Sequence, residues 1–141
     1  MKIPAHAYRE ELKVEPAHID ELQHVNNVVY LQWVQDVSAE HWFSLCPREL
    51  QKKYFWVVRR HELDYFRQAV VGDILHIYTW PSRPVGASSI RYVCMVNAST
   101  GKTVMEAKSK WTMLNAFTLR PEDVPEEIIR VLDLGDQPNG E

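Results

Sequence analysis

The sequence predicts a domain of the α+β class, in which a curved five-stranded antiparallel sheet wraps around one long central helix. Two observations lead to this prediction. Five segments have strand-like patterns and are joined by short connections rich in turn-forming residues. A single helical segment, beginning at Asn27, is apolar around most of its circumference, and the rest of the chain offers mainly strands to cover it.

The composition is that of one packed domain. The chain has 141 residues, of which 45% are hydrophobic and 25% charged, and its net charge is −3. Acidic and basic residues are mixed along the chain, so we expect no nucleic acid partner. The sequence has no signal-peptide pattern and no apolar run long enough to span a membrane. We therefore expect a single domain over residues 1–141, with its core at about 8–132, in a soluble, cytoplasmic protein with no membrane partner.

The first element is a strand with one solvent-facing side. In residues 8–15 charged side chains alternate with apolar ones, a period of two that is typical of a half-buried strand. Pro16 ends this strand, and residues 17–26 form a polar connection. Because loops position functional groups more often than strands do, chemistry is more plausible in this connection.

The second element is a helix of about 18 residues. Its polar residues recur every fourth position and form one narrow stripe, made of Gln32, Asp36, Glu40 and Ser44. Asn26 or Asn27 can cap the first turn, and Pro47 stops the helix. A helix with so little polar surface is expected to be wrapped by other elements.

The remaining elements are strands, apart from a helical turn expected at 48–52 and a short C-terminal helix at Glu126 to Leu132. Four segments rich in β-branched and aromatic residues predict strands at about 54–66, 73–81, 88–98 and 102–119. Cys46 and Cys94 lie in a helix end and a strand, and we expect both as buried, reduced thiols. A five-stranded sheet leaves edge strands unpaired, so we expect a homodimer or homotetramer.

The densest cluster of polar residues lies where the polar connection enters the long helix. The first turn of a helix has unpaired N–H groups that can stabilise an oxyanion. A carboxylate beside them, such as Asp20, can activate water or attack a carbonyl carbon. From the residues alone, hydrolysis of an acyl group and a purely structural role in turns and caps both remain open.

The same cluster carries a family resemblance. The pattern D-x-x-x-H-V-N-N-x-x-Y-L-x-W, from Asp20 to Trp33, resembles the signature of the hot-dog-fold thioesterases, the 4-hydroxybenzoyl-CoA thioesterase-like and acyl-ACP thioesterase-like superfamily. The segments 57–73 and 118–125 resemble the central strand of that family and its exit from the last strand. The resemblance implies a hot-dog fold and a thioesterase that hydrolyses acyl-CoA or acyl-ACP.

The resemblance also implies roles for individual residues. Asp20 matches the catalytic carboxylate, which acts as general base or nucleophile, and His24 and Asn27 match polar positions that orient water or the thioester. The backbone N–H groups near Asn27 and Val28 polarise the thioester carbonyl. In the plant-type acyl-ACP enzymes an Asn lies two residues after the Asp and a Cys lies on the central strand, whereas this chain has Leu22 and no Cys between 47 and 93.

Two further substrate-binding residues are expected on the strand at 88–98. Ser88 follows the Gly86 turn and is placed to face the thioester in the partner's site, and Arg91 is one of several arginines suited to coenzyme A phosphates. Histidine and cysteine spacing gives no metal-binding pattern, so we expect no metal and no organic cofactor. A non-catalytic acyl-thioester-binding protein and a hydroxyacyl-thioester dehydratase are the alternative functions.

Overall fold

The secondary structure follows the predicted order of elements. The computed structural model describes residues 1–135, and residues 136–141 lie outside the described part of the chain. The strands are β1 (Tyr8–Lys13), β2 (Tyr54–Tyr65), β3 (Ile74–Pro81), β4 (Ser88–Asn97) and β5 (Thr103–Asn115). The helices are α1 (Asn27–Leu45), α2 (Arg48–Gln51) and α3 (Glu126–Val131), and a short 3-10 turn covers Pro16–His18.

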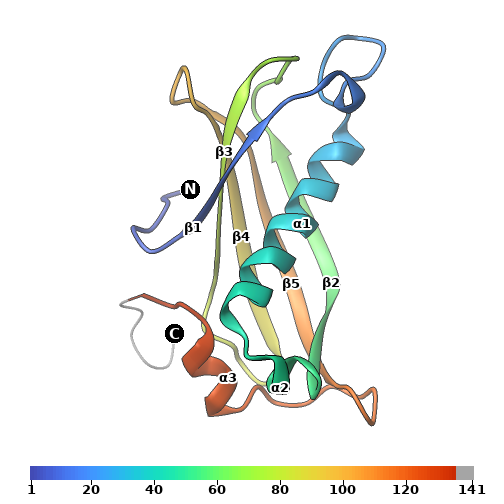
Figure 1. The fold of residues 1–141 in the computed structure, drawn as a ribbon, viewed down its shortest axis with the longest axis vertical. Helices are drawn as coiled ribbons and strands as arrows, with labels where there is room; N and C mark the ends of the chain where they lie inside the picture. Colours follow the sequence, from blue (N-terminus) through green and yellow to red (C-terminus); the bar gives the residue numbers. More distant parts are fainter. Residues whose placement is uncertain (136–141) are drawn as a thin grey trace.

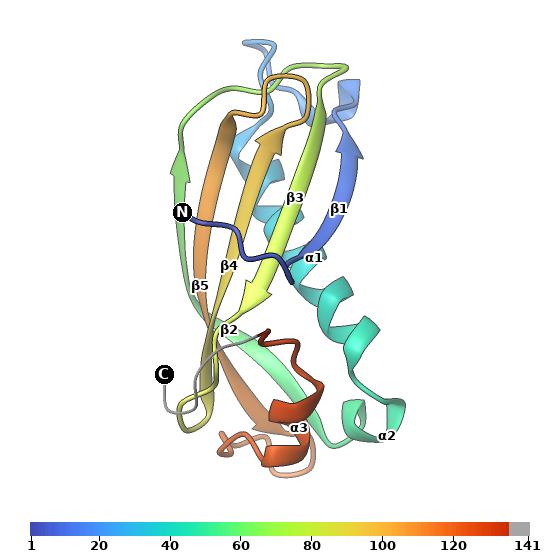
Figure 2. The same cartoon turned by 90° about the vertical axis from the view of Figure 1, so that its left-hand side faces the viewer.

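The strands form one antiparallel sheet in the order β1-β3-β4-β5-β2. The sheet curves around α1, which lies along its concave face (Figure 1; Figure 2). This arrangement confirms the predicted α+β class and the hot-dog fold. Strands β1 and β2 are the two edges of the sheet, so each has one side without a strand partner among the described residues.

The last strand is shorter than the prediction of 102–119. It ends at Asn115, whose side-chain oxygen accepts hydrogen bonds from the backbone N–H groups of Phe117 (2.8 Å) and Thr118 (3.0 Å). Leu119 then has a left-handed φ of 60°. An Asn side chain that binds the backbone two residues later is a turn former, and this local turn ends β5 early.

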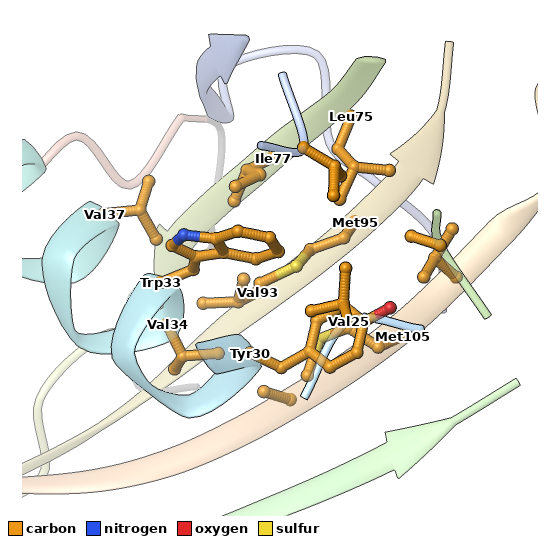
Figure 3. Close-up of a cluster of buried hydrophobic side chains, with 14 residues drawn as sticks. Val25, Tyr30, Trp33, Val34, Val37, Leu75, Ile77, Val93, Met95 and Met105 are labelled. Carbon is orange, nitrogen blue, oxygen red and sulfur yellow. The ribbon is translucent and has the colours of Figure 1, made fainter. Parts of the chain in front are cut away.

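The core lies between α1 and the inner face of the sheet (Figure 3). Trp33 and Val37 of α1 point toward Ile77 and Met95 of the sheet, and all four side chains are at least 94% buried. Tyr30 and Trp33 meet edge to face, with ring centroids 5.6 Å apart. The apolar residues at helical spacing therefore fix α1 against the sheet.

The outer face of α1 is not covered by the chain itself. Val28 and Phe43 are 71% and 59% exposed, respectively. The sheet reaches only one side of α1, so the single chain covers the helix incompletely. Cys46 and Cys94 are buried free cysteines, as expected.

Candidate active site

A tight hairpin holds the polar cluster in front of α1. The backbone N–H of Asp20 donates to the carbonyl of His24 (2.9 Å), and Ile19 pairs with Val25 in an antiparallel bridge. Gln23 takes a left-handed φ of 65° at the tip. Because Val25 is buried and its N–H donates to the Ala69 carbonyl (3.0 Å), the hairpin is anchored to the body of the domain.

The Asp20 carboxylate is half-buried and oriented by the same hairpin. Its Oδ1 accepts hydrogen bonds from the backbone N–H groups of Leu22 (2.9 Å) and His24 (3.4 Å). Within residues 1–135, no donor contacts Oδ2. One carboxylate oxygen is thus fixed by the backbone, and the other is available to water or substrate.

The helix start supplies one free amide beside this carboxylate. Asn26 is the N-cap, and its side-chain oxygen accepts from the Val28 N–H (3.0 Å). The Val28 amide is therefore already engaged, whereas the Asn27 N–H has no hydrogen bond to another described residue. Asn27 is the first helical residue, where the partial positive charge of the helix is concentrated. Of the two amides expected to bind an oxyanion, the Asn27 N–H is the available one.

Asp20, His24 and Asn27 lie in the wall of one surface pocket. The other walls come from Tyr30 of α1 and from the end of β2 and the residues after it, over 65–68. The structure thus brings the three predicted catalytic residues together. The sequence analysis did not predict that residues 65–68 line the site. The signal that could have indicated them is a Tyr-Phe pair followed by Arg and Gln at the end of a predicted strand.

Ser88 and Arg91 lie far from this pocket within the single chain. They are in the first half of β4, whereas the last residue of that strand, Asn97, pairs with Leu75 at the Asp20 end of the sheet. The Ser88 hydroxyl is half-buried, with Thr112 Oγ1 at 3.4 Å. The two predicted substrate-binding residues are therefore not brought together with Asp20 by one copy of the chain.

Arg91 belongs to a buried network under the second half of α1. Its side chain is 7% exposed, and Nη1 donates to His41 Nδ1 (2.9 Å) and Thr79 Oγ1 (3.1 Å). Burial lowers the pKa of Arg91 to about 10, so its guanidinium stays protonated at neutral pH. A group so buried is not placed to meet coenzyme A phosphates at the surface.

His41 is the neutral member of this network. It is 3% exposed, and burial, reinforced by the positive charge of Arg91, lowers its pKa from 6.5 to about 4. The unfolded chain therefore binds a proton at His41 in the range between these values while the folded chain does not. Since the state that binds more protons is favoured by acid, His41 makes the folded state less stable as the pH falls from 6.5 to about 4.

Replacement of His41 tests this pH dependence. In His41→Asn the side-chain oxygen can still accept from Arg91 but cannot bind a proton. We expect the free energy of unfolding, measured with urea at several pH values, to fall less on acidification in this variant than in the wild type. Equal loss in the two proteins would contradict a neutral, buried His41.

The described residues contain neither an evident metal site nor a membrane span. Over residues 1–135, no group of three or more His, Cys, Asp or Glu side chains is placed to hold a metal ion. In the same range, no helix is both long and apolar enough to cross a membrane.

Known proteins with related sequences are acyl-ACP thioesterases. The chloroplastic palmitoyl-acyl carrier protein thioesterase of Arabidopsis thaliana is 32% identical over 87 residues, which are 61% of this chain and 21% of the plant protein. The matched part of the chain thus spans about a fifth of the length of such curated relatives.

Solved structures with a similar fold cover the chain more completely. The probable thioesterase YbaW of Escherichia coli superposes with a TM-score of 0.79 at 22% identity, over 87% of this chain and 94% of that chain. A Thermus thermophilus thioesterase complexed with coenzyme A and Zn superposes with a TM-score of 0.79 at 23% identity, over 92% of this chain and 95% of that chain.

Comparison with known protein families assigns the chain to one of them. The acyl-ACP thioesterase N-terminal domain matches residues 5–132, which include every strand and helix described above. The chain therefore belongs to the acyl-ACP thioesterase family.

Proposed function

We propose that the protein is a thioesterase, which hydrolyses an acyl-CoA or acyl-ACP to the free acid and the thiol. The observation that carries this proposal is the pocket at the start of α1, where the Asp20 carboxylate faces the same space as His24 and the free N–H of Asn27. A base or nucleophile next to an oxyanion donor is what acyl transfer to water requires. Membership of the acyl-ACP thioesterase family supports the same reaction.

The reaction can use Asp20 in two ways. As general base, the carboxylate takes a proton from water while the water oxygen attacks the thioester carbon. As nucleophile, a carboxylate oxygen attacks that carbon and forms an anhydride, which water then cleaves. In both cases the carbonyl oxygen becomes an oxyanion that the Asn27 N–H stabilises, and the C–S bond breaks to release a thiolate that takes up a proton.

The substrate is an acyl group on coenzyme A or on an acyl carrier protein. Coenzyme A is bound by the structural relative from Thermus thermophilus, and acyl carrier protein is named in the curated plant relatives. A panel of acyl-CoA and acyl-ACP substrates, assayed for thiol release by the purified protein, tests the reaction and separates the two carriers. We place this activity in the cytoplasm.

We predict that the folded unit is at least a dimer, as a homodimer or homotetramer. Edge strand β2 has one side without a strand partner among residues 1–135, and Val28 and Phe43 leave apolar surface on α1. Pairing through an edge strand would cover both features. Sedimentation at micromolar concentration measures the mass, and a folded, active monomer would rule out this assembly.

We predict that chelators leave thiol release unchanged. The histidines and cysteines lack metal-ligand spacing, and the proposed chemistry needs only Asp20 and backbone amides. The similar Thermus thermophilus structure contains Zn, so the experiment discriminates between metal-independent and metal-dependent hydrolysis. Loss of activity in EDTA, followed by recovery on addition of a divalent ion, would show a metal-dependent site.

A further inference from the structure

A second cavity lies between the second half of α1 and the sheet, away from the Asp20 pocket. Its volume is about 310 Å³, at the small end of the range for ligand sites. Nearly half of the residues in its wall are aromatic, and these are Trp42, Phe43, Tyr54, Phe55, Trp56 and Trp111. Such a wall suits an apolar chain or ring, and the cavity has room for the end of an acyl group but not for a whole coenzyme.

The cavity also contains a buried positive charge. Arg91 lies in its wall, and the two hydrogen bonds that its side chain forms within residues 1–135 go to neutral groups, His41 and Thr79. Both bonds use Nη1, so the N–H groups of Nη2 and Nε have no acceptor in the described part of the chain. No carboxylate within residues 1–135 forms an ion pair with Arg91. A buried cation without an anion is costly, and the cost is relieved when a carboxylate or another oxygen acceptor binds.

A second donor in the same wall lacks an acceptor. The indole Nε1 of Trp111 is buried and has no hydrogen-bond partner among the described residues. In the sheet register, Ser89 pairs with Trp111 and Arg91 pairs with Ser109, so Arg91 and Trp111 are diagonal neighbours on adjacent strands. Ser89 already donates to the Ser82 carbonyl (2.9 Å) and does not satisfy the indole.

We propose that this cavity binds the far end of an acyl group that carries a carboxylate, with Arg91 as its cationic partner and the Trp111 N–H as a further donor. The inference rests on the proposed thioesterase function, and it names a substrate class: thioesters of dicarboxylic acids. The aromatic walls cover the apolar part of the chain, and the two unmatched donors select its charged end.

The spacing along α1 sets the length of such a substrate. Ser38, the first residue of α1 in the cavity wall, comes eleven residues after Asn27, and eleven residues of helix rise by about 16 Å. Within one chain, an acyl group that reached from the Asn27 amide to Arg91 would therefore have to be long.

Binding of small probes tests the cavity without any hydrolysis. Octanoate and 1-octanol share an alkyl chain and differ in charge, and the fluorescence of Trp42, Trp56 and Trp111 reports their binding. We expect the wild type to bind octanoate at least ten-fold more tightly than octanol. In Arg91→Met this preference disappears while octanol binding stays within two-fold, and in the exposed control Arg120→Met the preference is retained. Equal binding of the two probes by the wild type would overturn the proposal.

Two further variants test the proposal if Arg91→Met does not fold, as judged by the absence of cooperative unfolding. Arg91→Lys keeps the charge, and we expect it to retain a preference for octanoate. Trp111→Phe keeps the ring but removes the N–H, and we expect it to weaken octanoate binding several-fold without affecting octanol. Unchanged octanoate binding in Trp111→Phe together with no preference in Arg91→Lys would overturn the assignment.

Hydrolysis then connects the cavity to the substrate. Octanoyl-, dodecanoyl- and hexadecanoyl-CoA are each compared with the ω-carboxylated thioester of the same length. We expect kcat/KM to favour the ω-carboxylated hexadecanoyl thioester at least ten-fold, and Arg91→Met to abolish that preference. If the plain and the ω-carboxylated thioesters of each length are hydrolysed equally well, the inference fails while the proposed function stands. If octanoate binds at Arg91 but no thioester is hydrolysed, the proposed function fails and the carboxylate site remains.

Discussion

Asp20→Asn is expected to lower the turnover of thioester hydrolysis by about 100-fold or more, the contribution of a general base. Asn has the same size as Asp, and its side-chain oxygen can keep the two backbone hydrogen bonds that Asp20 Oδ1 accepts from Leu22 and His24. The hairpin therefore stays folded while the negative charge and the basicity are lost. Thiol release at saturating acyl-CoA measures the effect, and circular dichroism confirms the fold.

Three variants serve as controls for Asp20→Asn. Asp36→Asn makes the same chemical change on the exposed stripe of α1 and should leave turnover unchanged. His24→Ala and Asn27→Ala should cost less than Asp20→Asn, because the backbone N–H at the helix start remains. A folded Asp20→Asn protein with near wild-type turnover would show that Asp20 is neither base nor nucleophile.

Trp33→Ala is expected to lower the free energy of unfolding by about 3–5 kcal/mol, the usual cost of deleting a buried large aromatic side chain. Trp33 is 6% exposed and packs edge to face against Tyr30 and His18, with ring centroids 5.6 and 5.0 Å away. His18 belongs to the connection before the Asp20 hairpin, so the same change loosens the support of the pocket. Urea denaturation gives the free energy of unfolding.

The control for Trp33→Ala is Gln35→Ala, an exposed position on the same helix. Ala has the higher helix propensity, so this change should leave stability within about 0.5 kcal/mol of the wild type. If Trp33→Ala is no less stable than Gln35→Ala, the apolar face of α1 does not hold the helix on the sheet in the way that its burial indicates.

The fold was largely predictable because its signals are local. Alternation in residues 8–15 predicted the edge strand β1, and the apolar pattern from Asn27 predicted α1 with its observed start. The end of β5 was not predictable from strand patterning, because the side chain of Asn115 makes the turn by binding backbone groups that follow it. Turn chemistry of this kind outweighs the apolar pattern over a few residues.

The candidate site was predictable only where its residues are close in sequence. Asp20, His24 and Asn27 lie within eight positions, so one hairpin and one helix start bring them together. The hydrogen-bond partners of Arg91 come from α1 and β3, and no carboxylate among residues 1–135 forms an ion pair with it. No periodicity or spacing in the sequence contains that information.

Release of free thiol from acyl-CoA by the purified wild-type protein, measured without added metal and beside Asp20→Asn, tests thioester hydrolysis at the Asp20 pocket most directly. We predict catalytic turnover in the wild type, with many thiols released per protein chain, and a rate at least about 100-fold lower in the folded variant. Binding of acyl-CoA by the wild type without thiol release would contradict hydrolysis and would identify a non-catalytic acyl-thioester-binding protein.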